Sequence, residues 1–199
     1  MCHKASDPVL RTLLGLFRKC GGALDYIFLE RQVEGPPPAY HRAAALAGIA
    51  EINRSLEKWT AQTAASEEIP IENLFRVRWD ESKLIGEPIS FATFWGTDNI
   101  DPKPLGNGIW GLPDKDGYKT AFFHPPHGLQ GSPREKAELF DHINRYALGI
   151  DPQQAEIFAW STDWSNYFDA GHEWWGAFYW TIRPLGWNWM VVVAASSTD

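Results

Sequence analysis

The chain has 199 residues, enough for one hydrophobic core of ordinary size, which favours a single domain over residues 1–199. Hydrophobic residues make up 44% and charged residues 22%, a balance that excludes an intrinsically disordered chain. The net charge of -7 disfavours nucleic acid and anionic membrane surfaces as partners, because both attract clustered Lys and Arg.

The N-terminal part, residues 1–66, reads as mostly helical. Asp7–Pro8 combines a capping side chain with a proline at the first helical position, and Gly21–Gly22 ends that helix. A short apolar run at 26–29 fits more than one element type. A longer helix is predicted from about Ala39 to Ala65. Its buried stripe is expected to contain Leu46, Ile49, Ile52, Leu56 and Trp59.

The second part, residues 67–199, is rich in predicted strands. These strands are 89–95, 109–112, 118–123, 156–160, 177–182 and 188–195. Asp116–Gly117 favours a hairpin between 109–112 and 118–123, since this dipeptide tolerates positive φ. Val191–Ala195 shows no polar alternation and is expected to be covered on both faces.

One further helix is predicted near 133–148. Ser132 and Glu135 form a capping box around Pro133, which marks a helix start. Because helices mostly precede strands, the sequence predicts an α+β fold with N-terminal helices packed on a largely antiparallel sheet.

The cysteines and apolar runs bear on the compartment. Cys2 and Cys20 are too few for a disulfide framework, which favours a reducing compartment. The apolar run at 13–17 is too short for a signal peptide, and the run at 189–195 has the length of a strand. We therefore expect a cytoplasmic protein that does not enter a membrane.

Two local motifs resemble binding sites, one for a dinucleotide cofactor and one for a metal ion. Gly106–Gly111 matches the dinucleotide fingerprint, but prolines flank it where a strand and a helix are required. We interpret this match as accidental and expect no cofactor. His124 and His127 could bind a metal with His172 as third ligand, yet structural zinc usually uses cysteine. A turn with solvated histidines is the favoured interpretation.

The most distinctive segment is 160–176, which holds six aromatic residues, three carboxylates and one histidine. In one interpretation the rings pack on the sheet as a lid. In another they bind a protein partner of basic charge. The partner-binding candidates are Trp164, Tyr167, Trp174, Trp175 and Asp163. In a third, the segment forms a pocket where Asp169, His172 and Glu173 act as general acids and bases.

The same segment carries a resemblance. The run W-S-x-D-W-S-x-Y-F-D-x-G-x-E-W-W-G over 160–176, with the ending V-V-V-A-A-S-S-T-D, resembles small uncharacterised bacterial proteins. This resemblance implies a bacterial origin and no particular activity. Some bacterial immunity proteins are similar in size, acidity and aromatic content, which is an analogy of type.

Since the chain carries no complete catalytic motif, the leading hypothesis is a non-enzymatic, cytoplasmic, immunity-like protein that binds a partner through 160–176. The alternative is a hydrolase or lyase acting on a small polar substrate. Exposed aromatic side chains could equally form a homodimer seam.

Overall fold

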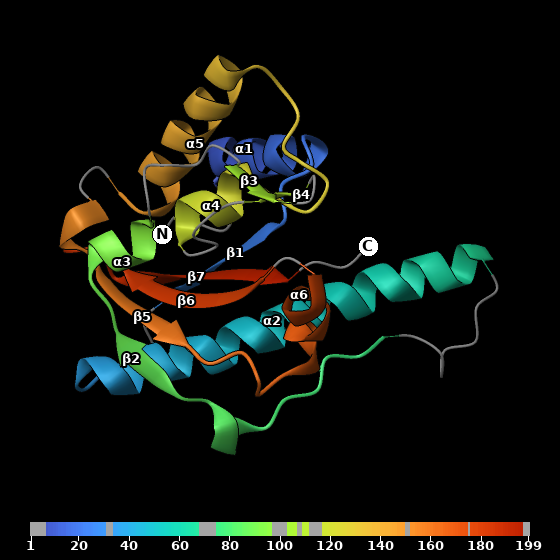
Figure 1. Ribbon diagram of the computed structural model, residues 1–199. Coiled ribbons are helices and arrows are strands. Elements are labelled where there is room, and N and C mark those ends of the chain that lie inside the picture. The colour runs from blue at the N-terminus through green and yellow to red at the C-terminus, as the bar shows by residue number, and fades with distance from the viewer. Residues whose placement is uncertain are drawn as a thin grey trace.

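Five antiparallel strands form the central sheet of the computed structural model, which describes residues 7–30, 34–67, 75–96, 103–106, 109–111, 117–149, 152–174 and 176–196. Their order is β1–β7–β6–β5–β2. The bounds are Leu24–Glu30 for β1, Gly86–Pro88 for β2, Glu156–Trp160 for β5, Ala177–Arg183 for β6 and Trp189–Ser196 for β7. A separate hairpin pairs β3, Lys103–Gly106, with β4, Ile109–Gly111. The first and last strands of the chain are neighbours (Figure 1).

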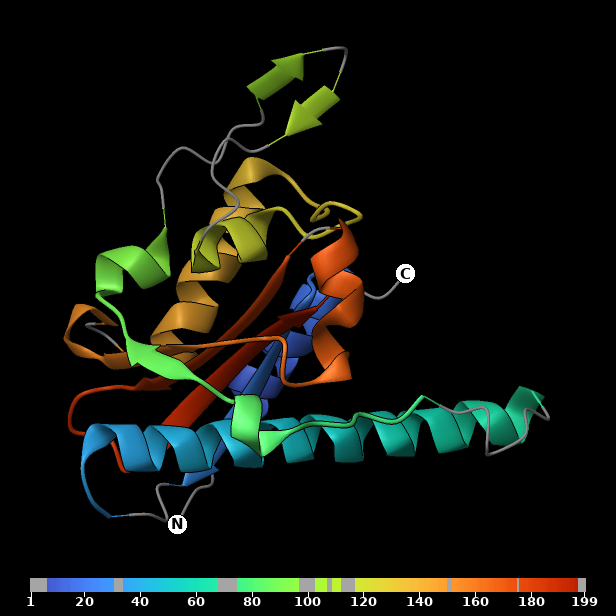
Figure 2. The same cartoon turned by 60° about the horizontal axis from the view of Figure 1, so that its bottom comes forward.

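Helices cover both faces of this sheet (Figures 1 and 2). One face carries α1 (Pro8–Lys19), α3 (Phe91–Trp95), α4 (Tyr118–Phe123) and α5 (Pro133–Ala147). The other face carries the long helix α2, Pro37–Glu67. Three 3-10 turns are η3 (Glu81–Lys83), η4 (Pro152–Gln154) and η5 (Asn166–Phe168), and η5 leads into α6, Asp169–Trp174. The α+β architecture predicted from the sequence is confirmed.

Strand β7 divides the core into two clusters. Val191 and Val193 face the helices α1, α3, α4 and α5, whereas Val192 and Ala194 face α2, as the alternation of a strand requires. The whole stretch 191–195 is fully buried, which confirms that both of its faces are covered. Within the described ranges, no helix is long and apolar enough to cross a bilayer.

Two predicted helix starts are confirmed by their caps. The Asp7 carboxylate accepts hydrogen bonds from the backbone N–H groups of Val9 and Leu10, at 2.9 and 3.2 Å. At α5, the Ser132 hydroxyl accepts from the Glu135 backbone N–H at 3.3 Å, and the Glu135 carboxylate accepts from the Ser132 N–H at 2.8 Å. These side chains satisfy backbone donors that a helix leaves open in its first turn.

Two predicted strands are wrong, because both form short helices. Residues 91–95 form α3, whose start is capped by the Ser90 hydroxyl accepting from the Thr93 N–H at 3.0 Å. Residues 118–123 form α4, which follows Gly117 at a φ of 98° and buries Tyr118, Ala121 and Phe122 on one side. This spacing of three and four residues is helical.

The hairpin of this region also lies elsewhere than predicted. It joins β3 to β4, so Gly106 and Ile109–Gly111 of the fingerprint lie in its two strands. Residues 112–116, which include the predicted turn at Asp116, lie outside the described residues.

The helix α2 follows the prediction except at its second half. Ile49 and Ile52 are buried against the sheet, but Trp59 is 61% exposed and not part of the stripe. The C-terminal end of the helix extends past the strands (Figure 2). The residues 24–30 within the predicted helical part form the edge strand β1.

Candidate functional site

The described aromatic rings of the segment after β5 point into the core. Trp164 is only 2% exposed, and its ring centroid lies 5.9 Å from that of Tyr179 on β6. Phe168 is fully buried with its centroid 5.4 Å from the same Tyr179 ring. Both belong to the core cluster beneath α2. Of the three interpretations of this segment, packing on the sheet describes these two rings.

Tyr167 is buried as well, and its hydroxyl forms a hydrogen bond to strand β1. Its hydroxyl donates to Asp25 Oδ2 at 3.0 Å, and Asp25 Oδ1 accepts from Arg18 at 2.9 Å. Burial, together with the nearby Asp25 carboxylate, raises the pKa of Tyr167 well above its ordinary value. The contact holds η5 against the edge strand β1.

The structure places the rings of Trp164 and Tyr167 inside the fold, whereas an anchor for a partner is expected at the surface; their role in partner binding stays a prediction. A ring packed against Tyr179 or tethered to Asp25 is not open to a second protein without unfolding. The side chains of Trp174 and Trp175 lie outside the described residues, so their part in that prediction stays a prediction.

The acidic side chains of the same segment face water. Asp163 is 87% exposed and Asp169 is exposed. The His172 Nε2 atom lies 3.7 Å from Asp163 Oδ1. His172 thus forms an ion-pair contact with Asp163. It lies three residues after Asp169 on α6 without an ion pair to it among the described residues, and the Glu173 side chain lies outside them.

Backbone hydrogen bonds fix this loop to the chain that leads into β2. The N–H of Asp80 donates to the Trp164 carbonyl at 2.8 Å, and the N–H of Ser161 donates to the Ile85 carbonyl at 2.7 Å. Trp79 and Ser165 form an antiparallel bridge next to the first of these bonds. The two segments therefore present one continuous rigid surface at the β2 end of the sheet.

We use the name acidic edge for four exposed residues in or next to these segments, Ile85, Glu87, Asp163 and Asp169. All four side chains are exposed, and Ile85 at 71% is an unusually open large hydrophobic residue. Pro88 limits the strand edge itself, because a proline nitrogen cannot donate to an added strand. Recognition at this edge would therefore rely on side chains.

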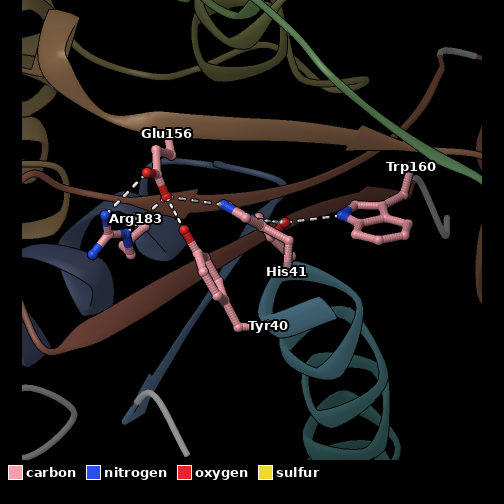
Figure 3. Close-up of polar contacts among 6 residues, drawn as sticks. Tyr40, His41, Glu156, Trp160 and Arg183 are labelled. Atoms are coloured by element: carbon pink, nitrogen blue, oxygen red, sulfur yellow. Dashed lines mark hydrogen bonds and ion pairs between the residues drawn. The ribbon is translucent and has the colours of Figure 1, made fainter. Parts of the chain in front are cut away.

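A second polar arrangement lies where α2 meets the sheet (Figure 3). Arg183 donates two hydrogen bonds to Glu156, at 2.8 and 3.0 Å, and the Tyr40 hydroxyl donates to the same carboxylate. The hydrogen bonds from Arg183 and then Tyr40 lower the pKa of Glu156 in spite of its partial burial. This group ties the first turn of α2 to β5 and β6.

His41 lies behind this group and is fully buried. Its Nδ1 atom is 2.7 Å from the Thr181 hydroxyl, its ring stacks on Phe158 at 4.4 Å, and its Nε2 atom is 3.9 Å from Glu156. Trp160 Nε1 donates to the same Thr181 oxygen at 2.9 Å. Burial lowers the pKa of His41 to about 4, even though the Glu156 carboxylate opposes that shift. The imidazole is therefore neutral at neutral pH.

The neutral His41 makes the fold sensitive to acid. Its folded pKa of about 4 is below the unfolded value of 6.5, so its contribution is complete above pH 6.5 and is lost as pH falls toward 4. At 1.36 kcal/mol per pH unit, we expect a loss of about 2 kcal/mol between pH 6.5 and 5. Urea unfolding at both pH values should show this loss, and His41→Gln should remove it. The matched control His142→Gln, on the exposed face of α5, should keep it; equal pH dependence in both variants would contradict the assignment.

Sequence reasoning did not single out Tyr40, His41, Glu156 or Arg183. One signal was available, since His41 lies eight residues before Ile49 and so continues the buried stripe of α2 by two turns. Its partner Thr181 is 140 residues away, and nothing local indicates that pairing. These contacts tie α2 to β5 and β6, while the Glu156 side chain stays 36% exposed and the buried Nε2 of His41 makes no hydrogen bond.

The histidine metal site weighed from the sequence is not assembled. His124 is the C-cap of α4 and His127 is exposed in the following turn, whereas His172 lies on α6 beside Asp163. In the part of the chain that the structure describes, no three His, Cys, Asp or Glu side chains are placed to hold a metal ion.

Comparison of the chain with protein-family models, with curated proteins and with solved structures found no match.

Proposed function

We propose that this chain is a protein-binding protein whose acidic edge holds a basic partner. The observation that carries the proposal is the opposite orientation of two kinds of side chain in one segment. The rings of Trp164 and Phe168 face the core, and the carboxylates of Asp163 and Asp169 face water. Carboxylates displayed on a rigid loop cost little to organise when a partner arrives.

The acidic edge also has an apolar contact point. Ile85 is 71% exposed and lies next to the loop that carries Asp163, through the bond between the Ser161 N–H and the Ile85 carbonyl. An exposed apolar side chain in a segment that also carries exposed charges fits the usual arrangement of an interface, in which an apolar centre is bordered by a polar rim. The carboxylates would speed the encounter with a basic surface and fix its orientation.

As in the hypothesis from the sequence, we place the protein in a bacterial cytoplasm. The residues that contact the partner differ from those of that hypothesis. Asp163 is a partner-binding residue in the leading hypothesis as well. Ile85 and Glu87 of the neighbouring segment replace the buried Trp164 and Tyr167 as contact residues. The pair of Asp163 and His172 suits a binding surface, because two groups open to water are screened and poorly placed for acid–base chemistry.

Site-specific photo-crosslinking tests the proposal. A photoreactive amino acid in place of Ile85 should give a discrete protein adduct in a lysate of the organism that encodes the chain. Reversing two rim charges with Asp163→Lys and Asp169→Lys should reduce the adduct at least about tenfold, equivalent to about 1.4 kcal/mol. Added salt should weaken it further, because the attraction is exposed to solvent.

Two matched controls lie on α5. The photoreactive residue at His142, also exposed, should give no adduct of that size. The pair Glu138→Lys and Asp141→Lys makes the same change in net charge and should leave the adduct from position 85 unchanged. Equal loss with both charge-reversed pairs would mean that net charge alone matters, and the acidic edge would lose its role.

A further inference from the structure

We infer that the outer edge of strand β1 is a self-association surface, on which β1 of a second copy adds antiparallel about a two-fold axis at Ile27. In the strand order of the sheet, β1 and β2 are the two outermost strands. The surface at β1 shares no residue with the acidic edge, so the inference goes beyond the proposed function.

Strand β1 has an open backbone edge. It pairs with β7 along its whole length, from Leu24 opposite Ala195 to Glu30 opposite Trp189. Within the described part of the chain, the backbone groups of 24–29 form hydrogen bonds with β7 and with no other segment. Alternate residues of an edge strand point their N–H and C=O groups away from the sheet. Those groups of β1 are therefore placed to bond a further strand.

The two edges of the sheet differ in how they are protected. Strand β2 has only three residues and ends at Pro88. Strand β1 has seven residues and contains no proline, no lysine and no bulge, which are common means of preventing an edge strand from pairing. Its Asp25 carboxylate already accepts hydrogen bonds from Arg18 and Tyr167, so it is not an unpaired charge at the edge. A long strand without these protective features favours a partner strand.

Half-buried apolar side chains lie on both faces of this edge. Phe28 packs on the core cluster beneath α1 and α5, and Leu29 packs on the cluster beneath α2. Phe28 also stands at the end of a row of rings, since its centroid lies 5.7 Å from that of Trp189, which lies 4.5 Å from that of Trp187. A strand added at β1 would cover Phe28 and Leu29 and continue this row.

Strand β1 is self-complementary in the antiparallel register centred on Ile27, in which two copies overlap over their full length. Each residue then lies opposite one that faces the same side of the sheet, because the two positions are an even number of residues apart. Ile27 meets its own copy and Tyr26 lies opposite Phe28, both of which are favourable cross-strand pairs. The acids Asp25 and Glu30 lie opposite leucines, so no like charges meet.

A second copy is the partner that closes both edges. When an extended peptide adds to β1, the outer edge of that peptide stays open, whereas a two-fold pair of β1 strands leaves neither strand with an open edge. The two-fold axis makes each contact occur twice, with the roles of the copies exchanged. The product is one continuous sheet that runs through both copies.

Analytical ultracentrifugation of two charge variants at one position tests the inference. From about 1 μM to 1 mM, the wild-type chain should show a reversible equilibrium between monomer and dimer. In the proposed register Leu29 of each copy lies opposite Asp25 of the other, whose side chain is 37% exposed. Leu29→Lys should therefore favour the dimer and Leu29→Glu oppose it. Their dissociation constants should differ at least about tenfold, because the pair occurs twice.

Disulfide formation tests the register independently. In a chain with Cys2→Ser and Cys20→Ser, the change Ile27→Cys places two thiols opposite each other, within the Cα separation that a disulfide spans. Mild oxidation should give a covalent dimer on non-reducing gel electrophoresis. Phe28→Cys is the matched control, because the two copies of position 28 lie diagonally, roughly 7–8 Å apart, and should form little disulfide.

Three controls make the outcome specific. His142→Lys and His142→Glu on the exposed face of α5 change net charge as the Leu29 variants do and should dimerise alike. Circular dichroism reports whether each variant is folded; if both Leu29 variants unfold, the wild-type equilibrium and the Ile27→Cys disulfide decide. The variant Asp163→Lys, Asp169→Lys should still dimerise, so failure at the acidic edge and failure here are separate results.

Several results would overturn the inference. These are a wild-type chain that stays monomeric over the whole range, folded Leu29→Lys and Leu29→Glu variants that dimerise equally well, or a disulfide at Phe28→Cys that forms as readily as the one at Ile27→Cys.

Discussion

Replacing Trp164 with alanine should destabilise the protein by about 3–5 kcal/mol, the usual cost of deleting a large aromatic side chain from a packed core. The indole is 2% exposed and packs against Tyr179 between α2 and the sheet. Removing it leaves a cavity in the cluster that joins the segment after β5 to α2. Urea unfolding followed by circular dichroism measures the loss of stability, and much of the variant should be unfolded at modest denaturant concentration.

The matched control for this change is Trp59→Ala. The same side chain is removed from α2, but Trp59 is 61% exposed, so stability should change by less than about 0.5 kcal/mol. If Trp164→Ala were as stable as Trp59→Ala, the ring would not belong to the core. The interpretation of the segment as an outward aromatic surface would then be restored.

Replacing Gly48 with alanine should cost about 1–3 kcal/mol, the range for overpacking a close contact. A Cβ atom at this position of α2 would lie 2.7 Å from the Tyr179 hydroxyl and 2.8 Å from a Val192 methyl group. The Tyr179 hydroxyl cannot simply move, since it donates to the Ala45 carbonyl at 2.6 Å. The helix would have to shift away from the sheet, and with it the turn that carries Tyr40 and His41.

Gly15→Ala is the control, because it should raise the free energy of unfolding where Gly48→Ala lowers it. Gly15 lies inside α1, and a Cβ atom added there would meet nothing within 4 Å, so alanine should stabilise the protein by up to about 1 kcal/mol through helix propensity. Thermal unfolding of both variants against the wild type gives the comparison. A stabilised Gly48→Ala variant would mean that α2 does not lie so close to β6 and β7.

The elements that sequence reasoning predicted correctly are those marked by strong local chemistry. Asp7–Pro8 and the Ser132–Glu135 capping box locate α1 and α5, because a capping side chain acts on neighbouring backbone groups. The strands β5, β6 and β7 are long and rich in β-branched and aromatic residues, and β7 is buried on both faces. These signals do not depend on the rest of the fold.

The errors occur where tertiary contacts decide. The short helices α3 and α4 contain aromatic residues that favour strands locally, yet Phe94 and Tyr118 stack at 4.9 Å in a core that only the helical form assembles. In the same way, Trp59 fits the periodicity of a buried stripe, but its side chain is 61% exposed. Periodicity describes a face of a helix and not what covers it.

The candidate site was only partly predictable for a related reason. The segment 160–176 was found from its composition. Of its exposed acids, Asp163 was expected to bind a partner, whereas Asp169 was expected only as a general acid or base under the enzyme alternative. Whether a tryptophan in such a segment faces inward depends on Tyr179 and α2, which are distant in sequence. The proposed role of Ile85 could not be predicted, because only the backbone pairing of 79–85 with 161–165 brings its segment next to the loop that carries Asp163.

In the segment after β5, the described rings face the core, while the carboxylates of Asp163 and Asp169 face water. Fluorine NMR of protein labelled with 5-fluorotryptophan tests this arrangement most directly, with the Trp164 and Trp59 resonances assigned through Trp164→Phe and Trp59→Phe. On exchange from water to deuterated water, the resonance of the exposed Trp59 should shift and that of Trp164 should stay in place. A Trp164 resonance that shifts as far as that of Trp59 would contradict the account.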